Sequence, residues 1–554
     1  MHRKLWLSLF AAVIGAGLLV AAAVAAPSNS GAPQVVKHAT AGGTFNIEIT
    51  SDVTSMDPAI DYYVPGWQLS YATACKLVNY PDKEGAAGSQ LVPEVAAGLP
   101  TISNNGKTYV FTIRSGYKFN TGENVTAKSF ADALNRDANP KIQSPAIAFM
   151  DVIAGANAMA DGKASTISGV KAAGNKLTIQ LTTASPDLLA RLALPFFSAI
   201  NPATAANLNP AGDDTAPSCG PYYIQSRVPN KEIILKRNTY YKGPRPHNVN
   251  EIDFKVGNTQ VVTEQNVTTG TADYANGGVP AADYKALADK YGVNKGRLFV
   301  KPTLSVYYVA MNQDRPLFKG ANAAPLGQAV NWALDRRAIL DQAGYLAGVR
   351  TTQVLPPGMP GYKACHCYQI NVTPGTIAKA KSLAKGHTGD GKAVLWSMGN
   401  TPTAVLQAQI MQFNLKQIGL DVDVQTYTRG VQIEKEQTRG ADFDFTADGW
   451  GADYADPYDF INVLLSGANL QASNNNNIAY FNNPKYNKLM LAASRLVGAP
   501  RYAAYGALDV DITKNAAPWA AYRNASQRDY VSARTGCYVF NPVFEMDYAA
   551  VCIK

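Results

Sequence analysis

The chain has few histidines and none of the short motifs that mark common catalytic sites. Only five of its 554 residues are histidine, and two of these stand at positions 2 and 38, so imidazole bases are scarce. No H-E-x-x-H, G-x-S-x-G or P-loop sequence occurs. Two S-x-x-K sequences begin at Ser115 and Ser382, but no K-T-G sequence accompanies them. The sequence therefore gives little support to these classes of enzyme.

Charge is also sparse and evenly spread. Only 16% of the residues are charged, with 50 Lys and Arg against 41 Asp and Glu. The basic residues form short clusters only, at Arg336-Arg337 and around Lys379 and Lys381. Because no basic stripe with interleaved aromatic residues is present, we do not expect nucleic-acid binding. Hydrophobic residues make up 47% of the chain, which is typical of a globular protein of two or three domains.

One long apolar run stands near the amino terminus, and no other stretch is apolar enough to cross a membrane. Arg3 and Lys4 precede the apolar residues Leu5–Val24, and Ala23-Val24-Ala25 is a small-residue cleavage site. This pattern predicts a secretory signal peptide at residues 1–25 and a periplasmic or secreted protein. An uncleaved membrane anchor is the alternative, since ~20 apolar residues span a bilayer. Residues 26–42 are rich in Pro, Ser, Gly and Ala and predict a linker.

The sequence Cys365-His366-Cys367 is unusual in a chain with only six cysteines. Two thiolates and an imidazole could ligate zinc or copper. No fourth ligand stands nearby, and secreted chains use an even number of cysteines for disulfides. We therefore predict a Cys365–Cys367 disulfide, or a mixed one, and no metal.

The other four cysteines are expected to form two further disulfides. Cys537 and Cys552 flank a short segment with a turn signal at Asn541-Pro542, so we predict a bond between them. Cys75 and Cys219 then pair by elimination. Six cysteines allow fifteen connectivities, of which this is one.

Strand-like and helix-like patterns alternate along most of the chain. Residues 43–49 and 105–114 alternate apolar and polar side chains as strands do. Thr126 predicts the N-cap of a helix that carries Phe130 and Leu134 on one face, and an apolar helix is expected to run through Leu77. The later pattern predicts strand 251–256, strand 304–312, helix 325–340, helix 376–384, strand 393–397, helix 403–418, strand 421–426, strand 443–447 and a strand near 517–522. Such alternation predicts an α/β fold with a parallel sheet.

The run Asp448–Phe460 combines a Trp, three Tyr or Phe rings and several Asp carboxylates. We expect it to be a loop that leaves the end of the strand at 443–447, because Gly449, Gly451 and the Asp456-Pro457 pair break regular structure. Loops at the carboxyl ends of strands are frequent ligand sites in α/β folds. Aromatic faces beside a carboxylate suit a ligand that is part apolar and part cationic, such as the amino terminus of a peptide.

Several ordered blocks of the sequence resemble one known family. These are Leu91–Ala97, which is similar to L-x-P-x-L-A; Asn105–Leu134, similar to K-x-Y-x-F-x-L-R…V-T-A; Ser218–Pro246, similar to G-P-Y…N-x-x-Y-x-G-x-x-P; Pro325–Leu340; the P-P-G sequence of Leu355–Gly361; and Trp450–Tyr454, similar to Trp-x-Ala-Asp-Tyr. Together they resemble the bacterial extracellular solute-binding proteins of the peptide/nickel class, which deliver substrates to ABC importers.

The resemblance implies a two-lobed periplasmic-binding-protein fold, class II-like, with an extra subdomain in the first lobe. Lobe I is then expected at residues 43–303 with the subdomain at approximately 60–200. Lobe II is expected at 304–520, and residues 521–554 return to complete lobe I. The implied mechanism is closure of the two lobes over a ligand.

The resemblance also implies a set of ligand-binding residues. Asp453 matches the Asp that binds the free α-amino group of a peptide in the oligopeptide and dipeptide receptors of the family, and Trp450 matches its Trp. Tyr454, Tyr62, Tyr63 and Trp67 are expected to line the cleft. The implied partners are a peptide or other small solute and a membrane permease, with no cofactor, and the protein is expected to be a monomer. The absence of a cysteine after the apolar run excludes the lipid attachment found in some members.

A secreted hydrolase acting on peptides or glycans is the second interpretation. Asp442 and Asp444 are two residues apart on a predicted strand, so both carboxyls would lie on one face. A nickel chelate or an oligosaccharide is the alternative ligand, because members of the family also bind these solutes.

Overall fold

The computed structural model describes residues 42–399 and 401–554. The predictions for the signal peptide at 1–25 and for residues 26–41 of the linker lie outside the described residues. In the described part of the chain, no helix is both long and apolar enough to span a membrane.

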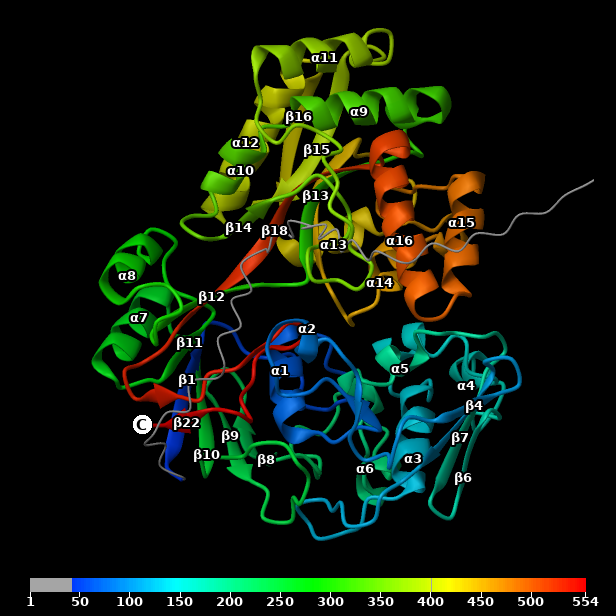
Figure 1. The fold of residues 1–554 in the computed structure, drawn as a ribbon, viewed down its shortest axis with the longest axis vertical. Coiled ribbons are helices and arrows are strands. Elements are labelled where there is room, and N and C mark those ends of the chain that lie inside the picture. Colours follow the sequence, from blue (N-terminus) through cyan, green and yellow to red (C-terminus); the bar gives the residue numbers. More distant parts are fainter. Residues whose placement is uncertain (1–41, 400) are drawn as a thin grey trace, which may run out of the picture. The chain divides into compact units, whose positions relative to one another are not determined.

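The first sheet has five strands, in the order β11-β1-β10-β9-β8 (Figure 1). β1 is parallel to β10 and β11, whereas β9 is antiparallel to both of its neighbours. The alternation predicted for 43–49 is confirmed, since Phe45 and Ile47 are fully buried. The strands are β1 (Thr44–Ile49), β8 (Tyr222–Val228), β9 (Glu232–Arg237), β10 (Glu251–Val256) and β11 (Tyr274–Asn276), and two helices follow β10 and β11, α7 (Gln260–Thr269) and α8 (Tyr284–Tyr291).

A separate four-stranded antiparallel sheet, in the order β4-β5-β7-β6, lies in the first half of the chain. Helix α3 (Ala127–Asp137) packs beside it, and Thr126 and Ser129 form the capping box at its start, which confirms the predicted N-cap. The sheet consists of β4 (Thr101–Ser103), β5 (Thr108–Thr112), β6 (Val170–Ala173) and β7 (Lys176–Gln180). Short elements in the same part of the chain are β2 (Val78–Asn79), β3 (Val92–Pro93), α2 (Gly85–Gly88), α4 (Ala156–Ala160), α5 (Leu188–Arg191) and α6 (Pro202–Ala206).

Helix α1 (Val64–Thr73) is buried from Gly66 onward. It ends four residues before Leu77, where the sequence pattern predicts its end. The backbone N–H of Gly220 donates to the carbonyl of Thr73 at 2.7 Å, and Ala74 is extended. The contact with a distant segment therefore replaces the next helical turn.

The second large sheet has seven strands and is mixed, so the prediction of a parallel sheet is only partly correct. β15 is parallel to β16 and β17, but β13 is antiparallel to β17 and β18. The order is β12-β18-β13-β17-β15-β16, and β14 pairs with β18. The strands are β12 (Leu298–Pro302), β13 (Ser305–Met311), β14 (Gly348–Arg350), β15 (Lys392–Met398), β16 (Asp421–Tyr427), β17 (Phe445–Gly451) and β18 (Trp519–Tyr530).

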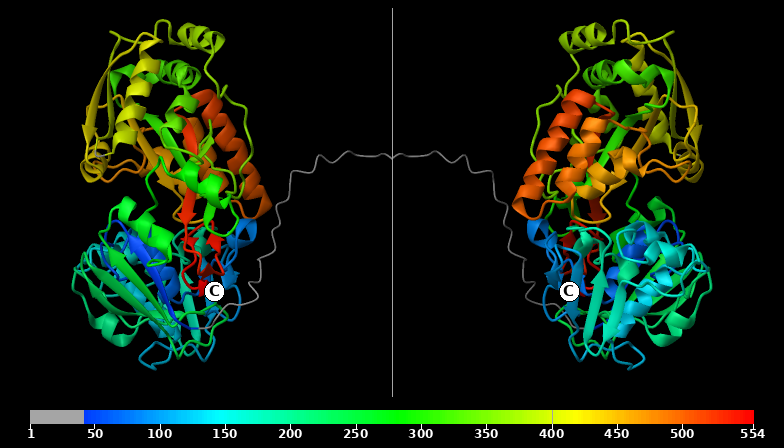
Figure 2. Two further views of the ribbon diagram at one scale, coloured as in Figure 1. Left: turned by 90° about the vertical axis from the view of Figure 1, so that its left-hand side faces the viewer. Right: turned by 90° about the vertical axis from the view of Figure 1, so that its right-hand side faces the viewer.

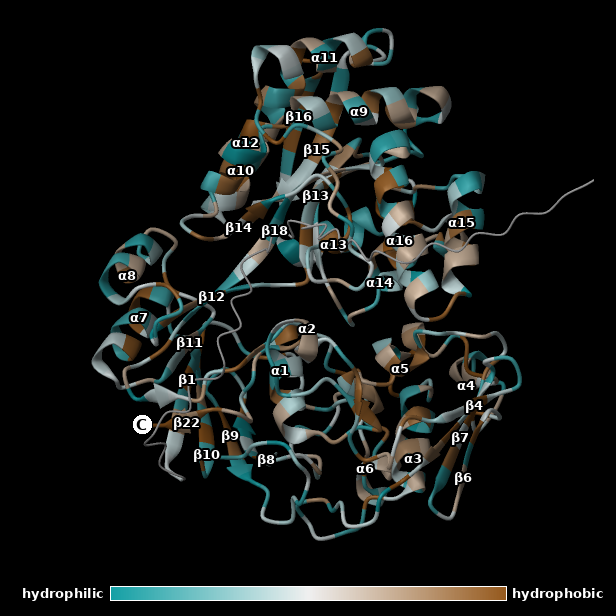
Figure 3. Ribbon diagram, in the orientation of Figure 1, coloured by the Kyte–Doolittle hydropathy of each residue, from teal (hydrophilic) through white to brown (hydrophobic). Residues whose placement is uncertain are grey.

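Helices pack on this sheet and on one another, and Figure 3 shows apolar and hydrophilic segments alternating along them. The helix predicted at 325–340 is two helices, because Leu334 is extended and Asp335 caps the second one through the N–H groups of Arg337 and Ala338. The helices are α9 (Ala323–Ala333), α10 (Arg336–Asp341), α11 (Pro374–Ala384), α12 (Pro402–Lys416), α13 (Arg429–Glu436), α14 (Tyr458–Leu465), α15 (Pro484–Ser494) and α16 (Ala499–Asp511).

Strand β18 joins the two large sheets, and its red ribbon is visible in both side views of Figure 2. Its first half pairs with β13 and β14, its second half pairs with β12, and Val531 just beyond it forms a bridge with Tyr274 of β11. The predicted boundary between residues 303 and 304 falls between β12 and β13. We retain the predicted lobe boundaries as a proposal, with β12 and β18 as the segments that connect the lobes.

The carboxyl-terminal segment packs against the first sheet. Arg534 forms an ion pair with the buried Asp273, whose carboxyl also accepts hydrogen bonds from the Asn46 N–H and the Ser532 hydroxyl. The short strands here are β19 (Thr535–Gly536), β20 (Phe540–Asn541), β21 (Glu545–Met546) and β22 (Cys552–Ile553).

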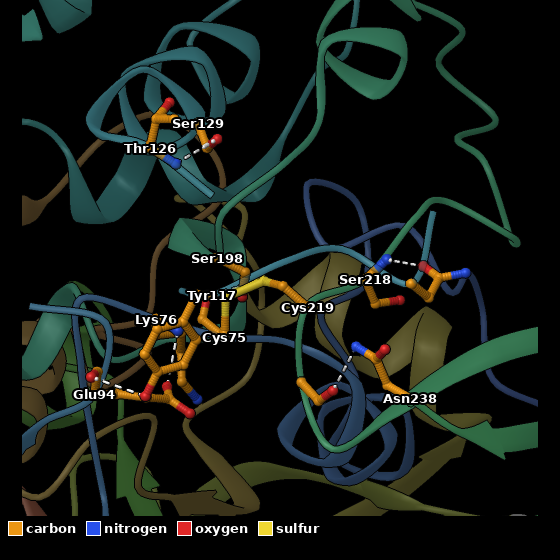
Figure 4. Close-up of a disulfide and its surroundings, with 12 residues drawn as sticks. Cys75, Lys76, Glu94, Tyr117, Thr126, Ser129, Ser198, Ser218, Cys219 and Asn238 are labelled. Atoms are coloured by element: carbon orange, nitrogen blue, oxygen red, sulfur yellow. Dashed lines mark hydrogen bonds between the residues drawn. A yellow bond between two sulfur atoms is a disulfide. The ribbon is translucent and has the colours of Figure 1, made fainter. Parts of the chain in front are cut away.

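The predicted disulfides Cys75–Cys219 and Cys537–Cys552 are confirmed. Figure 4 shows Cys75 and Cys219 between Lys76, Tyr117 and Ser198, and both cysteines are fully buried. The structure also joins Cys365 to Cys367, and none of the described cysteines is free.

Candidate ligand-binding site

Strand β17 is longer than the sequence predicts. It continues through Trp450 to Gly451 and pairs with β13 along its whole length. Gly449 does not break the strand: a Cβ at this position would lie 2.7 Å from the Tyr307 ring, so the glycine makes room for a cross-strand aromatic residue. The run Asp448–Phe460 is therefore the end of a strand, a short connection and the start of a helix, rather than one loop.

The connection between β17 and α14 carries Asp453. The Asp456 carboxyl accepts the N–H of Tyr458 at 2.9 Å and pairs with Arg501, which fixes the start of α14. Asp453 thus lies just beyond the carboxyl end of a strand, the position expected for a ligand site in this type of fold.

The Asp453 carboxyl contacts Tyr62, which precedes helix α1. The Tyr62 hydroxyl donates a hydrogen bond to Asp453 Oδ2 at 2.9 Å, and 43% of the Tyr62 surface is exposed. Protein atoms crowd the Asp453 carboxyl, and this burial raises its pKa to about 7 against the lowering effect of the Tyr62 hydrogen bond. A carboxyl group and an accessible aromatic ring therefore lie together although they come from distant parts of the sequence.

Asp459, in the first turn of α14, holds both Trp450 and Asp453. Its Oδ2 accepts hydrogen bonds from the Trp450 indole N–H at 3.2 Å and from the Asp453 backbone N–H at 3.0 Å. The side chain is fully buried, and its Oδ1 has no hydrogen-bond partner among the described residues. Burial, followed by the nearby Asp453 carboxyl, raises the pKa of Asp459 well above its ordinary value. Sequence analysis missed this residue, although its place in the first helical turn after Asp456-Pro457 is a usable signal.

Tyr62 belongs to an aromatic cluster with Trp67, Phe149 and Phe196. The Tyr62 ring centroid lies 5.3 Å from that of Trp67, 5.7 Å from Phe196 and 6.0 Å from Phe149. The Trp67 indole donates to the Asp61 carbonyl at 2.8 Å. Phe149 and Phe196 were also missed, because they lie in short 3-10 turns far along the chain and no local pattern links them to Tyr62.

The other two predicted residues differ in accessibility. Tyr63 is 42% exposed at the N-cap position of α1. Tyr454 is buried, and its hydroxyl donates to Asp187 at 3.1 Å. Tyr454 therefore packs in the interior behind Asp453 and does not present its ring to solvent.

The carboxylates considered for hydrolysis do not form a facing pair. Asp442 is exposed, whereas Asp444 is buried, accepts the Val394 N–H at 2.9 Å and pairs with Arg315. Asp444 also borders a cavity of about 720 Å³ at the amino ends of β15 and β16, which contains none of the predicted ligand residues. Within residues 42–399 and 401–554, no group of three or more His, Cys, Asp or Glu side chains is arranged to hold a metal ion.

The fold and the site together are those of a two-lobed α/β solute receptor. Asp453 lies at a strand end of one sheet, Tyr62 comes from the other half of the chain, and strands β12 and β18 connect the two parts. The family model for "Bacterial extracellular solute-binding proteins, family 5 Middle" matches residues 90–472. The chain belongs to this family, and the resemblance inferred from the sequence blocks is confirmed.

Individual relatives cover most of the chain. The periplasmic murein peptide-binding protein MppA of Escherichia coli is 28% identical over 80% of this chain and 81% of its own length. The periplasmic oligopeptide-binding protein OppA of Escherichia coli is 24% identical over 93% of each chain. Among solved structures, the clavulanic acid biosynthesis oligopeptide binding protein 2 has a TM-score of 0.84 and 20% identity, with 93% of this chain and 96% of that chain covered. These proteins are named as binding proteins, so the receptor interpretation is favoured over the hydrolase.

Proposed function

We propose that this protein is the substrate-binding receptor of an ABC importer and that its ligand is an oligopeptide or a similar solute with a free amine. The proposal rests on the hydrogen bond that the Tyr62 hydroxyl donates to the Asp453 carboxyl, just beyond the end of β17. The peptide ligands in the names of the two Escherichia coli relatives support the same class of ligand. The receptor would deliver its ligand to a permease in the cytoplasmic membrane.

Asp453 is the proposed anchor for the α-ammonium group of the peptide. An ammonium ion buried in a closed receptor needs an anionic partner, and an ionised Asp453 supplies one. Trp450, which Asp459 orients, and the exposed rings of Tyr62 and Tyr63 are the proposed aromatic wall. The peptide backbone can pair with strand edges, which gives affinity that does not depend on side chains.

Lobe closure is proposed to occur about the connecting strands β12 and β18. Small-angle scattering tests this step, and a mixture of short peptides is expected to reduce the radius of gyration. If peptides, oligosaccharides and nickel chelates all leave the scattering unchanged, the receptor proposal fails and a hydrolase assay becomes the appropriate experiment.

Titration calorimetry tests the ligand class. A tetrapeptide with a free amine is compared with the same tetrapeptide acetylated at its amino terminus, and acetylation is expected to abolish most of the affinity. Equal binding of the two forms would reject Asp453 as an amine anchor. Tight binding of an oligosaccharide or a nickel chelate, with no peptide binding, would replace the proposed ligand.

The proposal assigns no catalytic activity and no cofactor to the protein. It places the protein in the periplasm or outside the cell, as the names of the periplasmic relatives and the predicted signal peptide suggest, and proposes that it is a monomer. Mass spectrometry of solutes that copurify with the native protein would identify the ligand directly.

A further inference from the structure

The three disulfides differ sharply in accessibility. Cys75 and Cys219, drawn in Figure 4, are both fully buried, whereas in the Cys537–Cys552 bond Cys552 is fully buried and Cys537 is partly exposed. Cys365 and Cys367 are both partly exposed, and His366 between them is exposed. Thiol–disulfide exchange requires a thiolate to reach a sulfur atom, so access alone favours attack on the Cys365–Cys367 bond.

The loops that these bonds close also differ. The sequence separation is 144 residues for Cys75–Cys219 and 15 for Cys537–Cys552, but only two for Cys365–Cys367. A disulfide stabilises a fold mainly by restricting the unfolded chain, and this effect grows with the length of the loop. The Cys365–Cys367 bond therefore contributes least to folding, and the fold has the least to lose when it is reduced.

The backbone around Cys365 and Cys367 is held independently of their bond. The Cys365 N–H donates to Gln353 Oε1 at 2.8 Å, and the Gln353 amide donates to the buried Asp509 at 2.7 Å. Three residues after Cys365, the Tyr368 hydroxyl donates to the Thr513 carbonyl at 2.9 Å. These contacts do not involve sulfur, so after reduction the two thiols remain close enough to form the bond again.

We propose that Cys365 and Cys367 are a reversible dithiol–disulfide couple that exchanges with the dithiol of a thiol–disulfide oxidoreductase. A thiolate of the partner attacks one sulfur, the S–S bond breaks, and the departing thiolate takes up a proton. The second thiol of the partner then attacks the mixed disulfide and releases the second cysteine as a thiol. Two electrons and two protons pass to Cys365 and Cys367, and the dithiol of the partner becomes a disulfide. This activity is separate from ligand binding at Asp453.

Differential alkylation tests the proposal on the folded, full-length mature protein. The protein is equilibrated with increasing dithiothreitol, and in parallel with reduced thioredoxin as a protein dithiol, then alkylated and digested with trypsin. The tryptic peptide Ala364–Lys379 contains Cys365 and Cys367 and no other cysteine. Two alkyl groups are expected on this peptide at a reductant concentration about tenfold or more below that needed for the other four cysteines. Oxidised dithiothreitol should then restore the unlabelled peptide.

The double variant Cys365→Ser/Cys367→Ser is the matched control. Its melting temperature, and the reductant concentration that opens the other two bonds, are expected to equal those of the native sequence. Three outcomes would each overturn the proposal. In the first, all three disulfides are reduced together. In the second, thioredoxin does not reduce the Cys365–Cys367 bond. In the third, the peptide Ala364–Lys379 is alkylated before any reductant is added and cannot be reoxidised.

Discussion

The hydroxyl of Tyr62 donates a 2.9 Å hydrogen bond to the carboxylate of Asp453, although 391 residues separate the two in the sequence. Tyr62 stands before the first helix of the described chain, and Asp453 stands after β17 of the seven-stranded sheet. A ligand amine bound to Asp453, as proposed above, would therefore lie close to residues from both halves of the chain. This relationship underlies three of the five predictions below.

Asp453→Asn is expected to weaken the binding of a free-amine peptide by about 1.5–3 kcal/mol, the range for a hydrogen bond to a charged group. Titration calorimetry measures the change. Tyr62→Phe is the matched control, because it removes the hydroxyl partner of Asp453 and leaves the carboxylate and the aromatic ring in place. A Kd for Asp453→Asn equal to that of the native protein would contradict the assignment.

Peptide affinity is expected to increase as the pH rises through about 7. The folded-state pKa of Asp453 is raised from the ordinary value to about 7, so the carboxyl is mostly protonated below this pH and cannot pair with an ammonium ion. Well below the pKa, the affinity should fall about tenfold for each pH unit, and above pH ~8 it should fall again as the peptide amine loses its proton. Calorimetry at several pH values tests this profile. Asp453→Asn should abolish the rise through about pH 7, and a flat profile for the native protein would exclude Asp453 as the titrating group.

The raised pKa of Asp453 also predicts that the ligand-free protein becomes less stable as the pH rises, a trend opposite to that of peptide affinity. Between pH 3.8 and about 7 the folded state binds a proton at Asp453 that the unfolded state has lost, so the contribution of this residue to stability falls as the pH rises through that window. Thermal melts of ligand-free Asp453→Asn should therefore be less dependent on pH across this range than melts of the native protein.

Asp459→Ala is expected to weaken peptide binding by about tenfold or more, although Asp459 is not predicted to contact the ligand. The substitution leaves the partly buried Trp450 indole N–H and Asp453 backbone N–H without their acceptor. An unsatisfied donor costs up to about 1–3 kcal/mol where it is fully buried, so a smaller cost is expected for each of these two. Asp459→Asn keeps an acceptor oxygen and should recover most of the affinity. Tryptophan fluorescence should change in Asp459→Ala and not in Asp459→Asn. A loss of affinity that the asparagine variant does not rescue would show that the charge of Asp459, not its positioning of Trp450, matters.

Gly449→Ala is expected to reduce the free energy of unfolding by about 1–3 kcal/mol, because the added methyl group would lie 2.7 Å from the Tyr307 ring. Gly451→Ala is the control on the same strand, since a Cβ there meets no atom within 4 Å. Urea denaturation compares the two variants. Equal stability for both would mean that the Tyr307 ring moves aside at little cost.

Local patterns predict the framework of this protein well. Apolar alternation located β1 and β10, and the Thr126 cap located the start of α3, because these signals depend on neighbours in the sequence. The position of Asp453 just after a strand was predictable for the same reason.

Features that depend on tertiary contacts were not predictable in this way. β17 continues through Gly449 because Tyr307 of the neighbouring strand fills the space that the glycine leaves open. Phe149 and Phe196 join the Tyr62 cluster through packing between distant segments. The burial of Tyr454 depends on Asp187 in the same way.

The path of β18 and the segment after it also sets the order in which the molecule can be assembled. Asp273 is fully buried beside the first sheet, and its carboxyl forms an ion pair with Arg534 and accepts a hydrogen bond from Ser532. While the chain emerges from a ribosome or a translocation pore, Asp273 lacks Ser532, Arg534 and Thr535, so its contacts in the first sheet cannot be completed. The half of the protein that is made first is therefore completed last, and a nascent chain stays incompletely folded until almost all of it has emerged.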